Sequence, residues 1–299
     1  MGSLDDIYTR FKFRCDNSFG GFDAMGDGYL TGKLVLQFSS RLVVPVYEWL
    51  YKAAVRESNA AIVSALKVSI ASYADGIVTR FNTSGGCPLN GSQNGVGNSN
   101  SNAVAVRILA LAIYMGTDTT GAYQTALNGL NSLLTGPLFN YVPGVLSDEA
   151  YSASKPSDWL VQANWLHYQA YVANNYLSAC DVIGMTPGFD MVSYLLQAQS
   201  GFGGFKDVFY CISESRRGSF NTYTFAMYPL IRAGTASAIC AAEALWDQVE
   251  AQHTAIVGMT KRMYDFDGNT ASGDARYEVS FNATVLADCM LRFWFDARS

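Results

Sequence analysis

Charged residues are scarce in this chain. They make up 15% of its 299 residues and hydrophobic residues 49%, a balance that excludes a solvated coil and predicts a packed globular core. Acidic residues outnumber basic ones by 25 to 20, and the densest basic cluster is Arg216-Arg217, so we expect no nucleic-acid partner. No uninterrupted apolar run approaches the roughly 20 residues of a membrane-spanning helix, so we expect no membrane partner.

Histidine is rarer still, with only His167 and His253, so a catalytic Ser-His or Cys-His triad has few ways to form. The chain lacks a Gly-x-Ser-x-Gly elbow, a His-Glu-x-x-His pair, a P-loop and a dinucleotide fingerprint. These absences argue against a metalloprotease, a nucleotide hydrolase and a dehydrogenase. The run 265–269 begins like a calcium loop but lacks the later glycine and glutamate. We expect no metal and no cofactor.

The six cysteines include no Cys-x-x-Cys pair and no histidine at ligand spacing, which argues against a zinc site. Cys180, Cys240 and Cys289 lie in apolar helical stretches, where a buried thiol that acts as a small hydrophobic group is expected. Cys15 and Cys87 lie in loop-like sequence and are the candidates for a disulfide bond.

The composition favours an extracellular protein. Lysine is sparse, while Asn, Ser, Thr, Gly and Tyr are abundant, and glycosylation sequons begin at Asn82, Asn90 and Asn282. On this basis we expect a secreted protein. Because the first residues contain no charged-then-apolar leader, its signal is expected to be absent from this sequence.

Apolar residues recur mostly at spacings of three and four, which predicts a mainly helical protein. Pro45 is expected to kink or split the first predicted helix. The polar stretches 82–102 and 138–156 are rich in turn-forming residues and predict long surface loops. The expected helices cover residues 32–54, 59–81, 101–115, 120–134, 157–179, 190–198, 223–233, 235–251, 254–264 and 280–295.

Short turns alternate with long polar loops between these helices. This alternation is typical of helical hairpins packed around an axis, with the long loops gathered at one end. The sequence therefore predicts an α/α toroid, an incomplete barrel of helical hairpins, although an irregular helical bundle would satisfy the same periodicity. No boundary stands out, so we expect a single domain over residues 1–299.

Two segments, 18–23 and 201–207, share a Phe-Gly-Gly-Phe core, and the second follows the glutamine-rich run 197–199. They resemble the Gln-rich, Gly-Gly-Phe turns of α/α-toroid enzymes, which include polysaccharide lyases, glycoside hydrolases and terpenoid cyclases. The segment 267–284 is similar to the last loop-to-helix passage of toroidal sugar-cleaving enzymes. The resemblance implies a carbohydrate-active enzyme with a polysaccharide substrate.

The expected helix 157–179 carries an uncharged polar and aromatic strip beside its apolar stripe. No Asp, Glu, Lys or Arg lies between Trp159 and Cys180, whereas a face toward bulk water would favour them. The strip is therefore predicted to line a cavity or groove, the alternative being half-buried packing residues whose polar tips reach water or a carbonyl. Its members are Asn164, His167, Tyr168, Tyr171 and Asn175.

In α/α-toroid polysaccharide lyases, an Asn and an Arg neutralise a uronic acid carboxylate, a His or Tyr removes the proton from the adjacent carbon, and a Tyr protonates the departing oxygen. By residue type, the resemblance implies these catalytic roles for Asn164, His167, Tyr168 and Arg217. It thus implies β-elimination on a polysaccharide that contains uronic acid.

The remaining substrate-binding candidates lie near this strip in the expected fold. Arg216 and Arg217 form an unfavourable like-charge pair unless a ligand or Glu214 offsets it, and an exposed loop pair without ligand is the alternative. Asp158 is also explained by the preference for acidic residues at helix N-termini. The residues expected to bind substrate are Asp158, Tyr171, Asn175, Glu214, Arg216 and Tyr223.

Two other functions fit the same sequence. A glycoside hydrolase needs two carboxylic acids across a cleft, and several loop residues could supply them. A noncatalytic carbohydrate-binding protein would use the strip only to hold ligand. A terpenoid cyclase is disfavoured, because no Asp-rich motif stands in an expected helix. The candidate acids for a hydrolase are Asp148, Glu149, Asp158, Asp207, Glu214, Asp274 and Glu278.

Overall fold

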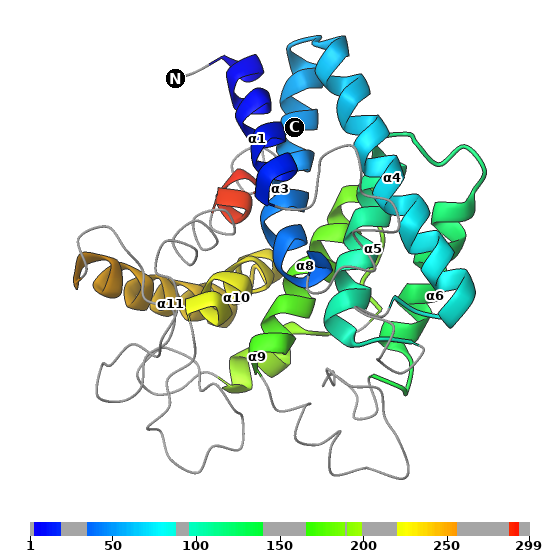
Figure 1. The fold of residues 1–299 in the computed structure, drawn as a ribbon. Coiled ribbons are helices and arrows are strands. Elements are labelled where there is room, and N and C mark those ends of the chain that lie inside the picture. Colours follow the sequence, from blue (N-terminus) through cyan, green and yellow to red (C-terminus); the bar gives the residue numbers. More distant parts are fainter. Residues whose placement is uncertain are drawn as a thin grey trace. The chain divides into compact units, whose positions relative to one another are not determined.

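The computed structural model describes residues 3–18, 35–87, 96–139, 166–188, 190–198, 220–255 and 287–292. Within these ranges all regular elements are helices and no strand occurs, which confirms the predicted mainly α class (Figure 1). The helices are α1 (Leu4–Ser18), α3 (Val35–Arg56), α4 (Ala60–Ser84), α5 (Ser99–Tyr114), α6 (Ala122–Thr135), α8 (Leu166–Ile183), α9 (Val192–Ala198), α10 (Phe220–Ala233) and α11 (Ala236–Ala255), followed by a helical turn at 287–292.

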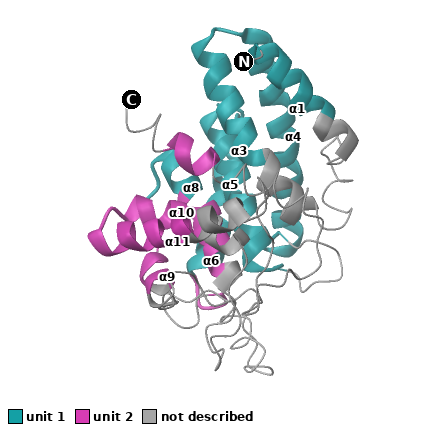
Figure 2. Ribbon diagram, turned by 90° about the vertical axis from the view of Figure 1, so that its left-hand side faces the viewer, with its two compact units in different colours: residues 1–135, 178–187 teal, residues 136–177, 188–299 magenta. Residues whose placement is uncertain are grey.

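The chain separates into two compact units (Figure 2). Unit 1 contains residues 1–135 and 178–187, and unit 2 contains residues 136–177 and 188–299. Because α8 contributes residues to both units, the division does not follow a simple break in the chain. The expectation of a single domain over 1–299 stays a prediction.

The core of unit 1 is built on α5, in which residues 99–112 are all buried. α4 and α6 both contact α5, and each buries one face. The buried positions of α4, such as Ile62, Leu66 and Ile70, recur at helical spacing, as expected for a helix that covers a core. Burial thus distinguishes α5, which is enclosed, from α4 and α6, which lie over it.

One helix among the described residues, α4, is long and apolar enough to cross a membrane by length and composition alone. Its sequence contains no long uninterrupted apolar run, because Lys67, Asp75 and Arg80 divide it. In the structure, α4 packs its buried face within unit 1 and contacts α3, α5 and α6.

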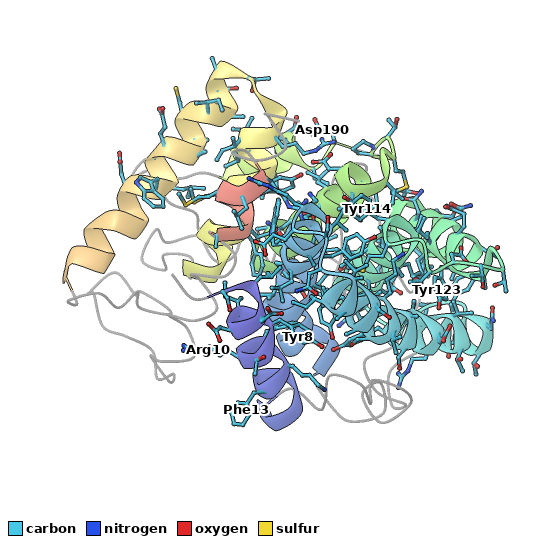
Figure 3. All side chains as sticks on the ribbon, turned by 90° about the horizontal axis from the view of Figure 1, so that it is seen from above. Tyr8, Arg10, Phe13, Tyr114, Tyr123 and Asp190 are labelled. Carbon is cyan, nitrogen blue, oxygen red and sulfur yellow. The ribbon has the colours of Figure 1, made fainter. Side chains whose placement is uncertain are left out.

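Helix α1 was not among the predicted helices. A reciprocal capping box starts it: the Ser3 N–H donates to Asp6 Oδ2 at 3.1 Å, and the Asp6 N–H donates to Ser3 Oγ at 3.2 Å. Phe11 packs edge to face on Tyr47 of α3, with ring centroids 5.2 Å apart. Phe13 is exposed and projects away from the neighbouring helices (Figure 3).

Several predicted boundaries differ from the observed ones. α3 runs through Pro45 as one helix, so of the two expected outcomes, a kink or a split, the split does not occur. The predicted loop 82–102 is shorter, because α4 continues to Ser84 and α5 begins at Ser99. α11 extends to Ala255, across the break expected between residues 251 and 254.

Unit 2 contains the first part of α8, together with α9, α10 and α11. α9, α10 and α11 contact one another, and residues 169–177 of α8 are buried. Asp190 caps α9 by accepting from the N–H groups of Val192 at 2.8 Å and Ser193 at 3.1 Å. The hydrogen bond from the Ser193 hydroxyl is the main cause that lowers the pKa of Asp190 below its usual value.

Candidate functional site

The predicted site residues fall into three groups in the structure. The first group, outside the described residues, comprises Asp158, Asn164, Glu214, Arg216 and Arg217. The second comprises His167 and Tyr168 in the first turn of α8 and Tyr223 in α10, whose backbone positions are described but whose side chains are not. The third comprises Tyr171 and Asn175 of α8, with described side chains. The catalytic and binding roles of all ten stay predictions.

Tyr171 and Asn175 are buried, with 0% and 3% of their surfaces exposed. The Tyr171 ring packs edge to face on Phe225 of α10, with centroids 4.9 Å apart and an interplanar angle of 81°. Asn175 Nδ2 donates to the backbone oxygen of Tyr171 at 2.9 Å. These two members of the strip do not face bulk water, as expected, and their contacts are those of the packing alternative.

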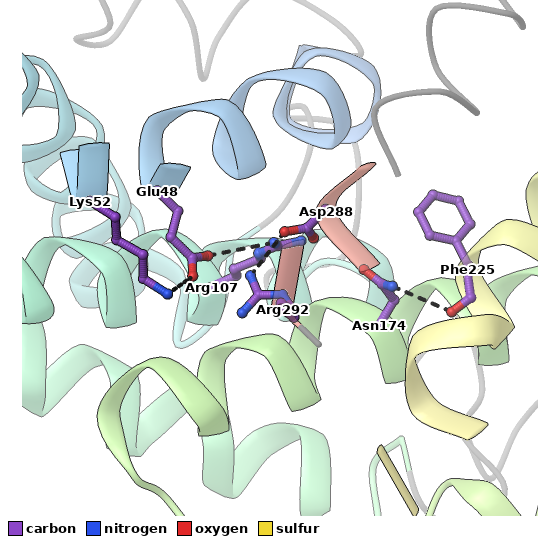
Figure 4. A network of polar contacts seen from close by, with 7 residues as sticks. All are labelled: Glu48, Lys52, Arg107, Asn174, Phe225, Asp288 and Arg292. Atoms are coloured by element: carbon purple, nitrogen blue, oxygen red, sulfur yellow. Dashed lines mark hydrogen bonds and ion pairs between the residues drawn. The ribbon is translucent and has the colours of Figure 1, made fainter. Parts of the chain in front are cut away.

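Asn174 links α8 to α10 within unit 2. Its Nδ2 donates to the backbone oxygen of Phe225 at 3.4 Å (Figure 4). In a regular helix this carbonyl would accept from the N–H four residues later, but that residue is Pro229, which has no N–H. The Asn174 amide therefore supplies the donor that the proline removes.

Unit 2 also contains a buried ion pair in the turn 287–292. Arg292 Nη2 lies 3.2 Å from Asp288 Oδ1, and the two side chains are 3% and 2% exposed (Figure 4). The guanidinium carbon lies 5.3 Å from the ring centroid of Tyr228. Between the two charges in sequence, burial and then the Asp288 charge raise the pKa of the Cys289 thiol to about 12. Sequence reasoning missed this pair because an i,i+4 pair is commonly a surface feature.

Unit 1 contains a second buried carboxylate beside an arginine. Glu48 Oε2 of α3 lies 3.8 Å from Arg107 Nη2 of α5, and Glu48 Oε1 lies 3.1 Å from Lys52 Nζ (Figure 4). Lys52 Nζ also lies 4.3 Å from the ring centroid of Trp49. Arg107 is the one charge in the apolar run 103–115, a signal that could have indicated a buried ion pair.

The start of α5 is a polar turn, defined here as residues 98–102, that is buried throughout. Asn98 caps the helix, with its Oδ1 accepting from the Ser101 N–H at 2.9 Å, and the Ser101 hydroxyl donates to the Asn98 backbone oxygen at 3.0 Å. Sequence reasoning assigned this stretch to a surface loop. Its burial is therefore a correction.

Asn102 joins the polar turn to the chain on both sides of residues 88–95. Its Oδ1 accepts from the Cys87 N–H at 2.8 Å, and its Nδ2 donates to the backbone oxygens of Val96 at 3.0 Å and Asn98 at 2.8 Å. Gly86 lies so close to Val96 that a Cβ there would stand 2.1 Å from the Val96 oxygen. Two hydrogen bonds of this buried amide, to Cys87 and Val96, thus hold together the two chain ends that flank residues 88–95.

The cysteines differ from the sequence prediction in two places. Cys87 is a free, buried thiol, which contradicts the predicted disulfide bond, and burial raises its pKa to about 12. Cys240 is exposed, so its predicted burial is wrong. Cys180 and Cys289 are buried as expected. Cys87 lies in loop-like sequence but can be buried, because its backbone N–H donates to the side-chain oxygen of Asn102.

Neither a family model nor a curated protein matches the chain at the level of sequence. Solved structures do match it. A glycosyl hydrolase family 88 protein from Bacteroides vulgatus has a TM-score of 0.57 and 13% identity over 97% of this chain and 86% of its own. A polysaccharide lyase has a TM-score of 0.58 and 11% identity over 97% and 85%. The cellobiose 2-epimerase of Spirochaeta thermophila has a TM-score of 0.54 and 9% identity over 96% and 97%.

These similarities confirm the predicted fold class, because they extend over nearly the whole chain and the matched proteins are α/α-toroid carbohydrate enzymes. The expected resemblance to such enzymes is thus confirmed at the level of the fold. The matched proteins include a hydrolase, a lyase and an epimerase, so the fold is common to several reactions on sugars.

Proposed function

We propose that the protein is an enzyme that cleaves a uronate-containing polysaccharide by β-elimination. The observation that carries this proposal is the similarity to a polysaccharide lyase over 97% of the chain. The uncharged polar strip of the sequence also supports it, because its described members, Tyr171 and Asn175 of α8, do not face bulk water.

The proposed reaction assigns a task to three residues of the strip and to Arg217. Asn164 and Arg217 bind the uronate carboxylate, which makes the proton on the adjacent carbon more acidic. His167 removes that proton, and Tyr168 protonates the oxygen of the departing sugar as the carbon–oxygen bond breaks. His167 and Tyr168 are consecutive residues in the first turn of α8.

The buried part of α8 supports this turn. Tyr171 lies three residues after Tyr168 and four after His167, which places all three on neighbouring positions of the helix surface. Its ring is fixed against Phe225, and Asn174 ties the same helix to α10. In this proposal the buried Tyr171 and Asn175 act by holding the first turn of α8 in place.

A glycoside hydrolase is the second candidate, supported by the similarity to a family 88 glycosyl hydrolase. This reaction requires two carboxylic acids that flank the glycosidic bond, one of them protonated. The predicted acids for this role lie outside the described residues. We also propose that the protein acts outside the cell, as its composition favours.

One assay separates these functions. The protein is incubated with a panel of uronate polymers and neutral polymers, and ultraviolet absorbance, reducing ends and product sugars are measured together. The proposal predicts new reducing ends together with the absorbance of an unsaturated product. Reducing ends without that absorbance would indicate a hydrolase, an isomerised sugar without cleavage an epimerase, and retention on polymer without any product a binding protein.

The chain offers a matched control for the catalytic assignment. His167→Ala and Tyr168→Phe are expected to reduce turnover at least 100-fold while the melting temperature stays close to that of the unaltered protein. His253→Ala removes the other histidine, and Tyr114→Phe alters an exposed tyrosine, and both are expected to retain full activity. Equal losses in the control variants would contradict the assignment.

A further inference from the structure

The polar turn at the start of α5 contains more hydrogen-bonding capacity than the described residues of unit 1 use. Asn98, Ser101 and Asn102 each make the hydrogen bonds described above, and all five residues from 98 to 102 are at most 3% exposed. The Ser99 side chain is different. Its Oγ is completely buried and has no hydrogen-bond partner among the residues that the structure describes.

Ser99 is the first residue of α5 after the cap residue Asn98. Side chains in an α-helix tilt toward its N-terminus, so a hydroxyl at this position lies at the end where the backbone N–H groups have no intrahelical acceptor. The unused hydroxyl and the helix N-terminus therefore coincide. A buried hydroxyl without a partner is costly, and a group that accepts its hydrogen bond would remove that cost.

The electrostatics of the turn favour an anion as that group. The helix dipole places partial positive charge at the N-terminus of α5, and the first turn contains no acidic residue that would neutralise it. Burial strengthens the effect, because the interaction acts in a medium of low dielectric constant. The turn is also preorganised, since Asn102 fixes it to the Cys87 and Val96 backbones.

We infer that the polar turn binds the carboxylate of an acidic sugar, with the Ser99 hydroxyl as the donor and the positive end of the α5 dipole as the favourable field. The choice of an acidic sugar among anions rests on the proposed function. Ligand access requires local opening around the turn, so the test uses an equilibrium measurement on the full chain. The site is separate in sequence from the strip on α8.

The test measures the melting temperature of the protein with sodium glucuronate or galacturonate at millimolar concentration. Glucose with sodium chloride of the same ionic strength is the neutral control, and sodium phosphate tests for a general oxyanion site. The uronates are expected to raise the melting temperature by a few degrees, and glucose is not.

Two serine variants make the assignment specific. Ser99→Ala is expected to raise the melting temperature of the ligand-free protein, because it removes the unsatisfied hydroxyl, and to abolish the shift with uronate. Ser178→Ala is the matched control: Ser178 of α8 is also fully buried, and the part of the chain that the structure describes offers its hydroxyl no partner, but it lies inside a helix. This variant is expected to keep the uronate shift.

The inference is overturned if uronate gives no greater shift than glucose, if Ser99→Ala keeps the shift, or if Ser178→Ala loses it. A shift with phosphate alone would overturn the assignment to an acidic sugar. The result is independent of turnover. If the protein cleaves no polymer but shows a uronate shift that depends on Ser99, the proposed function fails and this site is supported. If the protein cleaves polymer but shows no uronate shift, this site is excluded and the proposed function is supported.

Discussion

Helices α5 and α8 are both buried on all sides over long stretches, yet they accommodate polar residues in different ways. α5 gathers its uncharged polar residues in one turn at its N-terminus, where they bond the cap and the preceding chain. α8 spaces them along its length, and two of its amides donate to carbonyls, Asn175 to Tyr171 and Asn174 to Phe225. The comparison shows that polar side chains at the end of a helix can hold a preceding chain segment in place. Polar side chains inside a helix instead bond to carbonyls of the same helix or of the helix packed against it.

The largest effect is expected where α5 departs from its own pattern, at Arg107. This single charge lies inside the apolar part of the helix and faces Glu48. Arg107→Met removes the positive charge beside the buried Glu48 carboxylate. The free energy of unfolding, measured by urea denaturation, is therefore expected to fall by about 3 kcal/mol. Arg107→Met combined with Glu48→Gln is expected to lose clearly less. An equal or larger loss in the double variant would contradict a buried ion pair.

The polar turn itself is tested at Asn102. Asn102→Leu removes three hydrogen bonds and leaves the Cys87 N–H and the Val96 oxygen without their partner, so we expect a loss of about 2–3 kcal/mol. Hydrogen exchange is expected to accelerate at the Cys87 amide beyond the change in global stability. Unchanged exchange there would show that the amide is not what joins the two chain ends.

The thiol beside the turn predicts a pH dependence. The pKa of Cys87 is about 12 in the folded protein, above its ordinary value of 9.0. The thiol therefore contributes stability that is fully present below pH 9 and is lost as the pH rises toward 12, by about 1 kcal/mol at pH 10. Cys87→Ala is expected to flatten this part of the stability profile.

Chemical labelling gives the control for that prediction. A thiol reagent at neutral pH is expected to modify the exposed Cys240 in the native protein, and Cys87 and Cys289 only on unfolding, as read by mass spectrometry of peptides. Rapid modification of Cys87 would contradict its burial.

The smallest effect is expected in α8, at the hydrogen bond from Asn174 to Phe225. Asn174→Leu is expected to cost about 1 kcal/mol, because the Phe225 carbonyl loses its donor. In a Pro229→Ala background the helix regains its own N–H for that carbonyl, so the same substitution is expected to cost less. A double-mutant cycle measures this coupling. Additive effects would show that the proline does not explain the contact.

Sequence periodicity predicted most helices of the fold, because helical burial leaves a local signal in every turn. It missed α1, although Ser3 and Asp6 carry the spacing of a capping box. It also placed the polar turn of α5 on the surface. Asn102 can be buried only because the Cys87 N–H, 15 residues earlier in the chain, meets its amide, and such a tertiary partner has no local signature.

The candidate site was predicted less completely than the fold. The absence of charge between Trp159 and Cys180 correctly indicated that Tyr171 and Asn175 do not face bulk water. It could not distinguish a sugar-binding wall from internal packing, because both require uncharged polar and aromatic residues. The buried charges of Asp288 and Arg292 were missed because charge pairs at this spacing are usually solvated.

The most direct test of the central claim is an experimental structure of the protein with a bound uronate oligosaccharide, using His167→Ala to prevent turnover. The account predicts sugar rings beside the first turn of α8, with a carboxylate near Asn164 and Arg217 and the glycosidic oxygen near Tyr168. An oligosaccharide bound at full occupancy elsewhere, with this turn of α8 packed against protein, would contradict it.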